Sequence, residues 1–306
     1  MADHNIESVN IHAAWLHRIR GLGLKNFSLD KEFDIIEHEL LDDPDEDYTA
    51  SRGEYLNGRI MARYLKYEFI DAQEVIFFYE DGSLNLEKTT FTLRRRLEKI
   101  PRAVIPGFYG VMPNGTIKTF SRGGSDITGS LVARAASADL YENWTDVSGI
   151  LMADPRIVEN PMTIPQVTYD ELRELSYSGA QVLHEGTIFP VREKNIPLNI
   201  RNTNAPSDAG TMIKESFDGD HDPHRFITGI TGKKDFSIIT MFKRGMTSQV
   251  GVLRKVLTVL ERHGVSVDFV PNGIDNVSLV VRTETVAPHL YAILAQIQQE
   301  VQPDRL

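Results

Sequence analysis

Apolar residues recur every three to four positions through much of the chain, which is the spacing of one face of an α-helix. Helices predicted on this basis cover residues 5–20, 30–41, 56–64, 86–100 and 127–138. Short apolar runs between them predict strands at residues 68–71, 103–105, 116–120, 139–145 and 197–202. Because strands alternate with helices, the pattern predicts an α/β fold with a mainly parallel sheet.

The C-terminal part of the chain has a different order of elements. Strands are predicted at 236–242, 265–270 and 276–282, and helices at 249–262 and 286–299. The resulting order, βαββα, is one strand short of a ferredoxin-like unit. Because the preceding segment is polar and rich in turn residues, we predict one domain over 1–215, a linker over 216–233 and a second domain over 234–306.

Three polar turns gather between Thr119 and Arg156. The first, Ser121–Asp126, contains a Gly-Gly pair and opens a predicted helix, whose unpaired N–H groups and dipole suit an anion. The Arg122 guanidinium can donate two parallel hydrogen bonds to a carboxylate. Two more turns, at 145–149 and 153–156, follow the end of a predicted strand, where open α/β sheets bind ligands. Each turn alone is explained by capping or turn formation, but together they predict an active-site rim suited to phosphoryl transfer.

Two further segments allow two interpretations each. Ser51 and Glu54 have the spacing of a capping box before a helix, as do Thr168 and Glu171, but Glu54 could also face a substrate ammonium group. The His/Asp-rich segment 218–224 has metal-ligand residues, although a hydrophilic linker is favoured because no apolar scaffold flanks it.

Composition excludes several classes of protein. A net charge of −10 disfavours nucleic-acid and anionic-membrane binding, and the absence of cysteine excludes thiolate metal sites and cysteine nucleophiles. No apolar run approaches the roughly 18–20 residues that cross a bilayer, and the acidic N-terminus does not predict a signal peptide. We therefore expect a cytoplasmic protein. Walker, Gly-x-Gly-x-x-Gly, His-Glu-x-x-His and Gly-x-Ser-x-Gly motifs are also absent from the sequence.

The combination of these segments resembles aspartate kinase of the amino-acid kinase family. The resemblance runs from about residue 48 to the end, and is carried by Ser51–Glu54, Phe120–Asp126, Trp144–Gly149, Ala153–Arg156, 179–184, Asn199–Asn202 and Gly210-Thr211. It implies a three-layer αβα amino-acid kinase (carbamate kinase-like) domain lacking its N-terminal strand. A partial ferredoxin-like α+β ACT regulatory domain would follow it.

The resemblance also implies a reaction and its cofactors. ATP would phosphorylate the side-chain carboxylate of L-aspartate to 4-phospho-L-aspartate, the first step of lysine, threonine and methionine biosynthesis. Mg²⁺ would be held mainly by the nucleotide phosphates. A lysine or threonine effector is expected on the ACT domain, which is also expected to form a homo-oligomer.

Site residues follow from the resemblance position by position. Glu54 would face the substrate ammonium group, Arg122 its α-carboxylate, and Ser125 and Asp126 would shape that end of the site, with Arg122 and Asp126 as catalytic residues. The nucleotide side would comprise Thr145, Asp146, Asp154, Arg156 and Gln181. The effector would contact Met246, Gly251, Val252, Leu253, Ser266, Val267 and Asp268.

The sequence departs from the family in three places. A Lys-Phe-Gly-Gly strand, whose lysine neutralises the transferred phosphoryl group, is not found, Gln181 replaces a second lysine, and only one ACT-like unit is present. We therefore expect a fragment truncated at both ends, with weak turnover by itself. The alternative is a catalytically incompetent regulatory subunit that binds an amino acid. Another amino-acid kinase, such as glutamate 5-kinase, is disfavoured by the Ser51–Glu54 segment and the ACT-like tail.

Overall fold

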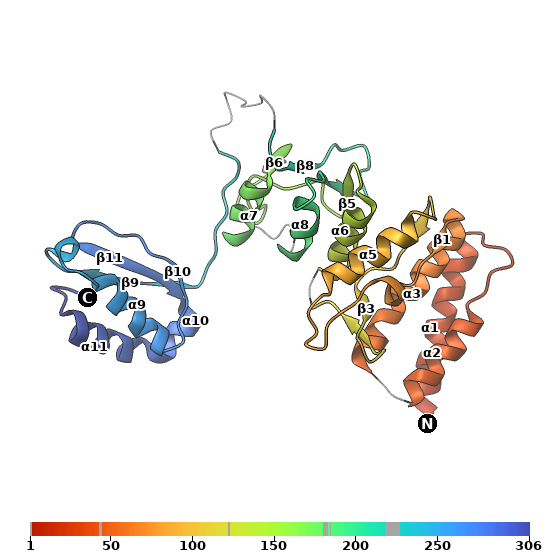
Figure 1. Cartoon of the computed structure of the whole chain (residues 1–306), viewed down its shortest axis with the longest axis horizontal. Helices are drawn as coiled ribbons and strands as arrows, with labels where there is room; N and C mark the ends of the chain where they lie inside the picture. Colours follow the sequence, from red (N-terminus) through yellow and green to blue (C-terminus); the bar gives the residue numbers. More distant parts are fainter. Residues whose placement is uncertain (1, 43–44, 122, 180–182, 184, 218–226) are drawn as a thin grey trace. The chain divides into compact units, whose positions relative to one another are not determined.

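The structure, a computed structural model, describes residues 2–42, 45–121, 123–179, 183, 185–217 and 227–306 (Figure 1). The chain divides into two compact units, Met1–Thr231 and Gly232–Leu306. Residues 218–226 fall in the predicted linker and outside the described residues, so the limits drawn from the sequence stay a prediction. Within the described residues, no helix combines the length and the apolar character needed to cross a membrane.

Three helices form the N-terminal part of the first unit: α1 (Ala2–Gly21), α2 (Asp30–Asp42) and α3 (Glu46–Leu65). They share a buried apolar cluster of Ile19, Leu29, Phe33, Leu56 and Ile60. The Asp45 side chain caps α3 by accepting a hydrogen bond from the Tyr48 N–H at 2.8 Å. The prediction that Ser51 caps this helix is therefore wrong, because a better-placed acceptor starts the helix earlier.

Short strands and helices follow in a second group. These are β1 (Glu68–Phe69), α4 (Ala72–Val75), α5 (Leu86–Leu97), β2 (Ala103–Val104), β3 (Tyr109–Val111) and β4 (Ile117–Thr119). β1 and β2 pair in parallel, and β3 and β4 form an antiparallel hairpin that turns over residues 112–116. The strand predicted at 103–105 is present as β2, and both of its residues are half-buried.

A third group contains the main sheet of the first unit. Its elements are α6 (Gly124–Ala136), β5 (Tyr141–Thr145), β6 (Gln166–Thr168), α7 (Tyr169–Tyr177), α8 (Glu185–Arg192), β7 (Leu198–Asn202) and β8 (Thr211–Lys214). The strand order is β5-β7-β8-β6. The pairs β5–β7 and β6–β8 are parallel, whereas β7 and β8 are antiparallel. The predicted α/β class is confirmed, but this sheet is mixed because a short connection returns the chain from β7 to β8.

The second unit contains one three-stranded antiparallel sheet in the order β10-β11-β9. Its elements are β9 (Phe236–Phe242), η1 (Met246–Ser248), α9 (Val252–Arg262), β10 (Val267–Phe269), β11 (Asn276–Arg282), α10 (Thr283–Val286), η2 (Ala287–His289) and α11 (Leu290–Val301). Buried residues of β9, β11, α9 and α11 form one core. The predicted strands are found, but the helix predicted over 286–299 is broken at η2, where Pro288 removes a backbone donor.

Candidate active site

A cavity of about 450 Å³ lies between α3 and the start of α6. Its lining residues are Ala50, Gly53, Glu54, Phe108, Ser121, Gly123, Gly124, Ser125 and Asp126. Glu54 stands on the exposed side of α3, and Ser125 and Asp126 belong to the first turn of α6. The structure thus brings together three of the predicted site residues from two distant segments of the chain.

Glycine is required at the turn that opens α6. Gly123 has φ +58° and occupies the N-cap position, where it carries no side chain to accept from the first-turn N–H groups. A Cβ on buried Gly124 would come within 2.9 Å of the Phe120 Cβ and 3.0 Å of the Phe108 Cα. Phe108 itself has φ +82°, an uncommon conformation for a bulky residue. The turn therefore leaves helix N–H groups free to meet an anion from the cavity.

Asp126 is tied to the neighbouring strand β5. One oxygen of its carboxylate accepts a hydrogen bond from the Asn143 amide at 2.9 Å, and its backbone carbonyl accepts from the Tyr141 hydroxyl at 3.1 Å. Burial and the nearby Asp126 carboxylate raise the pKa of Tyr141 to about 12, so the hydroxyl stays a donor at neutral pH. In this geometry Asp126 fixes the start of α6 against β5.

On its buried side, α3 is held by an arginine that the sequence did not single out. Arg52 is 8% exposed, and its guanidinium lies 4.3 Å from the ring centre of Tyr48, 4.9 Å from that of Tyr55 and 5.4 Å from that of Tyr109. It also donates to the Ser51 hydroxyl at 2.9 Å. Cation–π contacts strengthen when water is excluded, so this cage anchors the helix that carries the cavity carboxylate.

Tyr109, one of the three rings around Arg52, also contacts the buried carboxylate of Asp71. The Tyr109 hydroxyl donates to Asp71 at 2.8 Å, and burial together with that carboxylate raises the pKa of Tyr109 far above its ordinary value. Tyr109 begins β3 and directly follows Phe108 of the cavity wall. The hydrogen bond therefore links the helix cage to the strand beside the site.

A second anchor joins the start of α3 to β4. Asp47 accepts hydrogen bonds from the Lys118 ammonium, at 2.7 Å, and from the Thr119 hydroxyl. Burial opposes ionisation of Asp47, but the bonds from Lys118 and Thr119 outweigh it and lower the carboxyl pKa. Because β4 leads directly into the Gly-Gly turn, this anchor sets the turn relative to α3.

Four residues predicted for the nucleotide side are described, and they do not line this cavity. Thr145 ends β5, and its hydroxyl donates to Asp146, which is exposed. Arg156 pairs with Asp154 through two nitrogens, at 2.9 and 2.7 Å, and its side chain is 80% exposed. None of the four is among the described residues that line the cavity. Their nucleotide role stays a prediction.

Two predicted residues and one motif fall outside the described residues. These residues are Arg122 and Gln181. The structure therefore does not describe the expected contact of Arg122 with the substrate α-carboxylate, or the position at which Gln181 replaces the family's lysine. The His/Asp segment 218–224 is outside as well. In the described part of the chain, no group of three or more carboxylate or imidazole side chains is arranged to hold a metal ion.

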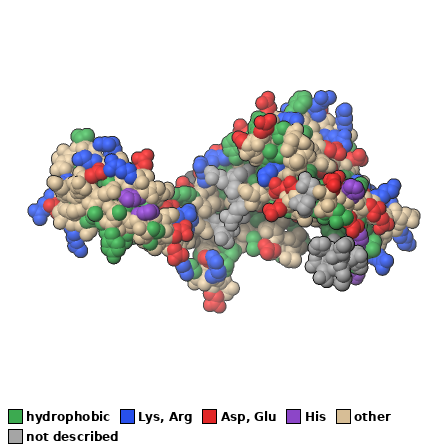
Figure 2. Space-filling view, turned by 90° about the horizontal axis from the view of Figure 1, so that it is seen from below, with side chains coloured by type: hydrophobic (Ala, Val, Ile, Leu, Met, Phe, Trp, Pro, Cys, Tyr) green, Lys and Arg blue, Asp and Glu red, His purple; other side chains and the backbone are tan. Residues whose placement is uncertain are grey.

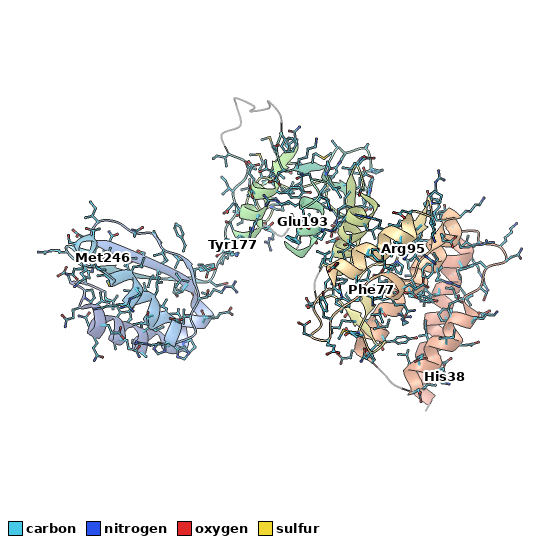
Figure 3. The ribbon with its side chains drawn as sticks, viewed as in Figure 1. His38, Phe77, Arg95, Tyr177, Glu193 and Met246 are labelled. Atoms are coloured by element: carbon cyan, nitrogen blue, oxygen red, sulfur yellow. The ribbon has the colours of Figure 1, made fainter. Side chains whose placement is uncertain are left out.

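The predicted effector residues belong to the second unit. Val252 is buried in its core, and Met246 (Figure 3) and Val267 pack against the same core. Gly251 caps α9 with φ +84°, and Leu253 is 42% exposed. Ser266 and Asp268 flank Val267 at β10, where Ser266 is exposed. Three of the seven residues therefore have a packing role whatever else they do.

Charge is distributed without a single dominant patch on the face that Figure 2 shows, where Lys and Arg side chains alternate with Asp and Glu over both units. Several charges of the first unit are paired: Arg192 contacts Glu215 and Asp170, both at 2.9 Å, and Arg134 contacts Glu193. The ion pairs between α8 and its neighbours are exposed on at least one side, so each stabilises the unit only weakly.

Comparison with known proteins extends the description. The model of the amino acid kinase family matches residues 2–202. Aspartokinase 3 of Bacillus subtilis is 34% identical over 269 residues, which are 85% of this chain and 59% of that protein. The chain thus spans about three fifths of this curated relative.

Comparison with solved structures leads to the same family. The crystal structure of Clostridium acetobutylicum aspartate kinase superposes with a TM-score of 0.81 and 46% identity, over 97% of this chain and 67% of that one. Escherichia coli aspartokinase III, solved in complex with aspartate and ADP, shares the fold with a TM-score of 0.62 and 22% identity, over 90% of this chain and 66% of that one. With its α/β fold, its glycine turn and a family match that covers about two thirds of its length, the chain belongs to the amino acid kinase family.

Proposed function

We propose that this chain transfers the γ-phosphoryl group of ATP to the side-chain carboxylate of L-aspartate, giving 4-phospho-L-aspartate and ADP. The observation that carries the proposal is the cavity that places the Glu54 carboxylate opposite the open N-terminus of α6. An amino acid needs one anion for its ammonium group and a donor set for its α-carboxylate. Glu54 provides the first, and the α6 N–H groups with Ser125 and Arg122 provide the second.

The reaction needs little from the protein beyond positioning and charge. The aspartate side chain is ionised at neutral pH, with an ordinary pKa of about 3.9, so no base is required to make it a nucleophile. One of its oxygens bonds to the γ-phosphorus as the bond to the β,γ-bridging oxygen breaks, and ADP leaves with that oxygen. Asp126 positions the start of α6 in this scheme, because its carboxylate accepts a hydrogen bond from Asn143.

ATP would approach from the side of Thr145, Asp146, Asp154 and Arg156, and Gln181, which is outside the described residues, is predicted to act on the nucleotide side. Mg²⁺ would arrive on the nucleotide phosphates, where it neutralises charge on the transferred group. The E. coli relative, whose structure holds aspartate and ADP, supports the same pair of ligands here.

Trapping of the acyl phosphate tests the proposal. The purified chain is incubated with ATP, Mg²⁺ and L-aspartate in hydroxylamine, which converts an acyl phosphate into a coloured hydroxamate, and ADP release is followed in parallel. The proposal expects both products with L-aspartate and neither with L-asparagine, which lacks the carboxylate. Calorimetry that finds no binding of L-aspartate, together with no hydroxamate, would refute it.

A regulatory subunit that binds an amino acid without turnover is the second candidate. It is favoured by the cavity lining, because none of the described lining residues is lysine or arginine. The nearby Lys118 is bonded to Asp47. Heat on titration of an amino acid, with neither ADP nor hydroxamate formed, would select this candidate.

Regulation through the second unit is part of the proposal. A lysine or threonine effector would contact Met246, Gly251–Leu253 and Ser266–Asp268, and the three-stranded sheet would associate with a second copy. A structure of E. coli aspartokinase III holding lysine as well as aspartate supports an amino-acid effector. Titration of L-lysine and L-threonine, with the mass of the particle followed by light scattering, separates effector binding from association.

A further inference from the structure

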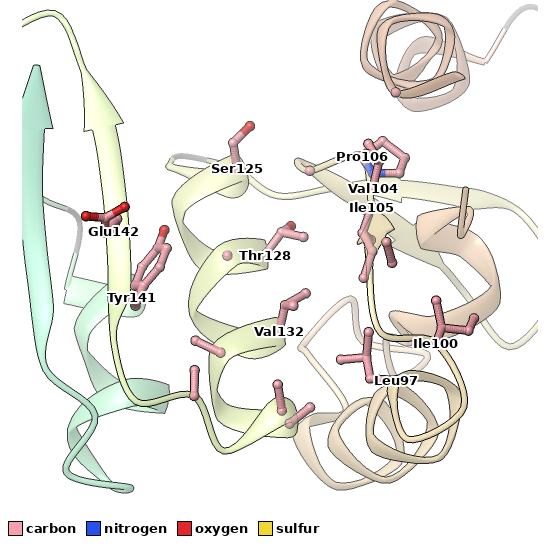
Figure 4. Close-up of a pocket in the computed structure, with 18 of the residues that line it drawn as sticks. Leu97, Ile100, Val104, Ile105, Pro106, Ser125, Thr128, Val132, Tyr141 and Glu142 are labelled. Carbon is pink, nitrogen blue, oxygen red and sulfur yellow. The ribbon is translucent and has the colours of Figure 1, made fainter. Parts of the chain in front are cut away.

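Asn143 is a buried polar residue of β5 that lies next to the candidate active site without lining it. The residue is 7% exposed, and it is not among the described residues around the α3–α6 cavity. Because side chains alternate along a strand, Asn143 shares one face of β5 with Tyr141. That face is turned towards α6: in Figure 4 the Tyr141 ring stands beside the helix, with its hydroxyl directed towards the Ser125 end. A buried amide is stable only when it is hydrogen-bonded, so the partners of Asn143 indicate its role.

Two acceptors fix the orientation of the Asn143 amide. Its Nδ2 donates to a carboxylate oxygen of Asp126 at 2.9 Å and to the Tyr141 hydroxyl oxygen at 3.3 Å. Tyr141 keeps its proton because burial and the Asp126 carboxylate raise its pKa to about 12, and it donates that proton to the Asp126 carbonyl at 3.1 Å. An ionised carboxylate only accepts, and the proton of the tyrosine is already used. The nitrogen end of the amide therefore faces both groups.

A glycine on α6 lets this network form. A Cβ on Gly129 would lie 2.4 Å from the Tyr141 hydroxyl oxygen and 2.8 Å from the ring carbon that carries it. Any larger residue would therefore push the ring away from the helix, and the hydroxyl away from the Asp126 carbonyl three residues earlier in the chain. The close contact holds β5 and the first turn of α6 in a fixed relation.

Asp126 occupies the third position of α6, where a carboxylate commonly folds back onto the start of its own helix. In a capping box, the acidic residue three positions after the N-cap bonds to the N-cap N–H, and the helix dipole attracts the same charge into the first turn. The N-cap here is Gly123, three positions before Asp126. The carboxylate nevertheless bonds to Asn143, and within the described residues no side chain accepts from the first-turn N–H groups.

We propose that Asn143 is a positioning residue for the substrate α-carboxylate: by holding the Asp126 carboxylate against β5, it keeps the first-turn N–H groups of α6 open for the amino acid. Asn143 touches no substrate and acts through Asp126. Without the amide, the Asp126 carboxylate would turn onto these N–H groups and compete with the substrate carboxylate for the same donors. The inference rests on the proposed function for the identity of the ligand, but the position of Asp126 is measurable without a ligand.

The position of Asp126 is read first, in the full chain and without any ligand. Amide resonances of Gly124 and Ser125 are followed by NMR as the pH is lowered, because an amide bonded to a carboxylate shifts when that carboxylate takes up a proton. We expect a larger shift in Asn143→Leu than in the unsubstituted chain, and its loss in Asn143→Leu/Asp126→Ala, which lacks the carboxylate. Asn143→Ala is measured in parallel, since it removes the amide without adding apolar bulk.

Affinity for L-aspartate, measured by calorimetry, is read second. We expect Asn143→Leu to weaken binding by on the order of tenfold, because Asp126 then competes for the donors of the α-carboxylate. Asn143→Leu/Asp126→Ala should recover most of that loss, because the competitor is gone. A purely structural role for Asn143 would give no recovery, since the second substitution does nothing to restore packing that the first disturbed. Ser130→Ala, which removes a buried hydroxyl on the same helix, should retain the affinity.

The outcomes separate this inference from the proposed function. No aspartate binding by the unsubstituted chain would refute the proposed function, and the amide shifts alone would then decide the position of Asp126. Where the unsubstituted chain binds aspartate, equal affinity in Asn143→Leu, or a double variant that binds no better than Asn143→Leu, would overturn the inference. Amide shifts that are equal in Asn143→Leu and the unsubstituted chain would overturn it in either case.

Discussion

The aspartate side and the nucleotide side of the candidate site differ in how the fold holds them. Glu54, Ser125 and Asp126 stand on two helices and line one cavity. Thr145 and Asp146 stand at the end of β5, and Asp154 and Arg156 stand in a loop. Thr145 donates to Asp146, and Arg156 pairs with Asp154. The first set lines a cavity that suits a small ligand, whereas Asp146 and Arg156 of the second set are exposed.

The difference originates in the contacts that hold each of the two sets of residues in the fold. Behind Glu54, α3 is fixed by the Arg52 cage and by the bonds of Asp47 to β4. Arg156, by contrast, pairs with Asp154 of the same loop, and its side chain is 80% exposed. Charged groups held by buried contacts recognise a ligand without reorganisation, whereas exposed ones must first order their side chains. We therefore expect mutations on the aspartate side to have larger effects.

The largest effect is expected at Gly124. In Gly124→Ala the new Cβ meets the Phe108 backbone at 3.0 Å and the Phe120 Cβ at 2.9 Å, so the turn has to move. We expect L-aspartate binding to be lost and the free energy of unfolding to fall by about 1–3 kcal/mol, measured by calorimetry and urea denaturation. Gly21→Ala is the control, because its Cβ meets nothing within 4 Å. Normal aspartate binding by Gly124→Ala would show that the turn is not part of the site.

The second largest effect is expected at the Arg52 cage, in which Arg52 contacts three tyrosine rings on the buried side of α3. Arg52→Met keeps an unbranched apolar stem but removes the guanidinium that contacts three tyrosine rings. We expect the free energy of unfolding to fall by about 2 kcal/mol and aspartate affinity to fall with it. The exposed Arg63→Met in the last turn of the same helix is the control. Unchanged aspartate affinity in Arg52→Met would mean that the cage stabilises α3 without positioning the site.

A smaller effect is expected on the nucleotide side. Arg156→Ala should weaken binding of ATP or a non-hydrolysable analogue by about tenfold, since one exposed cation is lost. Aspartate binding should not change. Fluorescence titration with a labelled nucleotide measures the first, and calorimetry the second. A loss of aspartate binding equal to the loss of nucleotide binding would erase the distinction between the two sides.

The smallest effect concerns pH and the anchor at the start of α3. The Asp47 pKa is lower in the folded chain than its ordinary value of 3.8, so its contribution to stability is present above that value. It is lost as the pH falls through the lower folded pKa. Because the two side chains are 27% and 40% exposed, solvent screens the pair and we expect less than about 1 kcal/mol. The free energies of unfolding of the chain and of Lys118→Met, measured in urea, should differ at pH 6 and converge as the pH falls below 3.8 and through the lower folded pKa of Asp47; a constant difference would contradict this account.

The sequence predicted the turn that opens α6, because a Gly-Gly pair before a helix is a signal that needs no distant partner. The residues of this turn line the cavity. Capping boxes show the limit of such signals. Thr168 and Glu171 form one with both reciprocal bonds, but the same pattern at Ser51 and Glu54 lies inside α3, because Asp45 caps that helix first. Local spacing cannot decide between two competing caps.

Features that depend on distant partners were missed. β6 and β8 have three and four residues, too few for a periodic signal, and become strands only by pairing with each other across the fold. The Arg52 cage needs Tyr109 from β3 beside two tyrosines of α3. No spacing within one segment predicts that meeting. Glu54, by contrast, was found because a resemblance supplied the long-range information.

Titration of L-aspartate into the chain and into Glu54→Gln is the most direct test of the central claim, that the α3–α6 cavity binds the amino acid. The variant keeps the shape of the side chain and removes the charge that would face the ammonium group. We predict that aspartate affinity falls on the order of a hundredfold while nucleotide affinity is unchanged. Equal aspartate affinity in the two proteins would contradict the account.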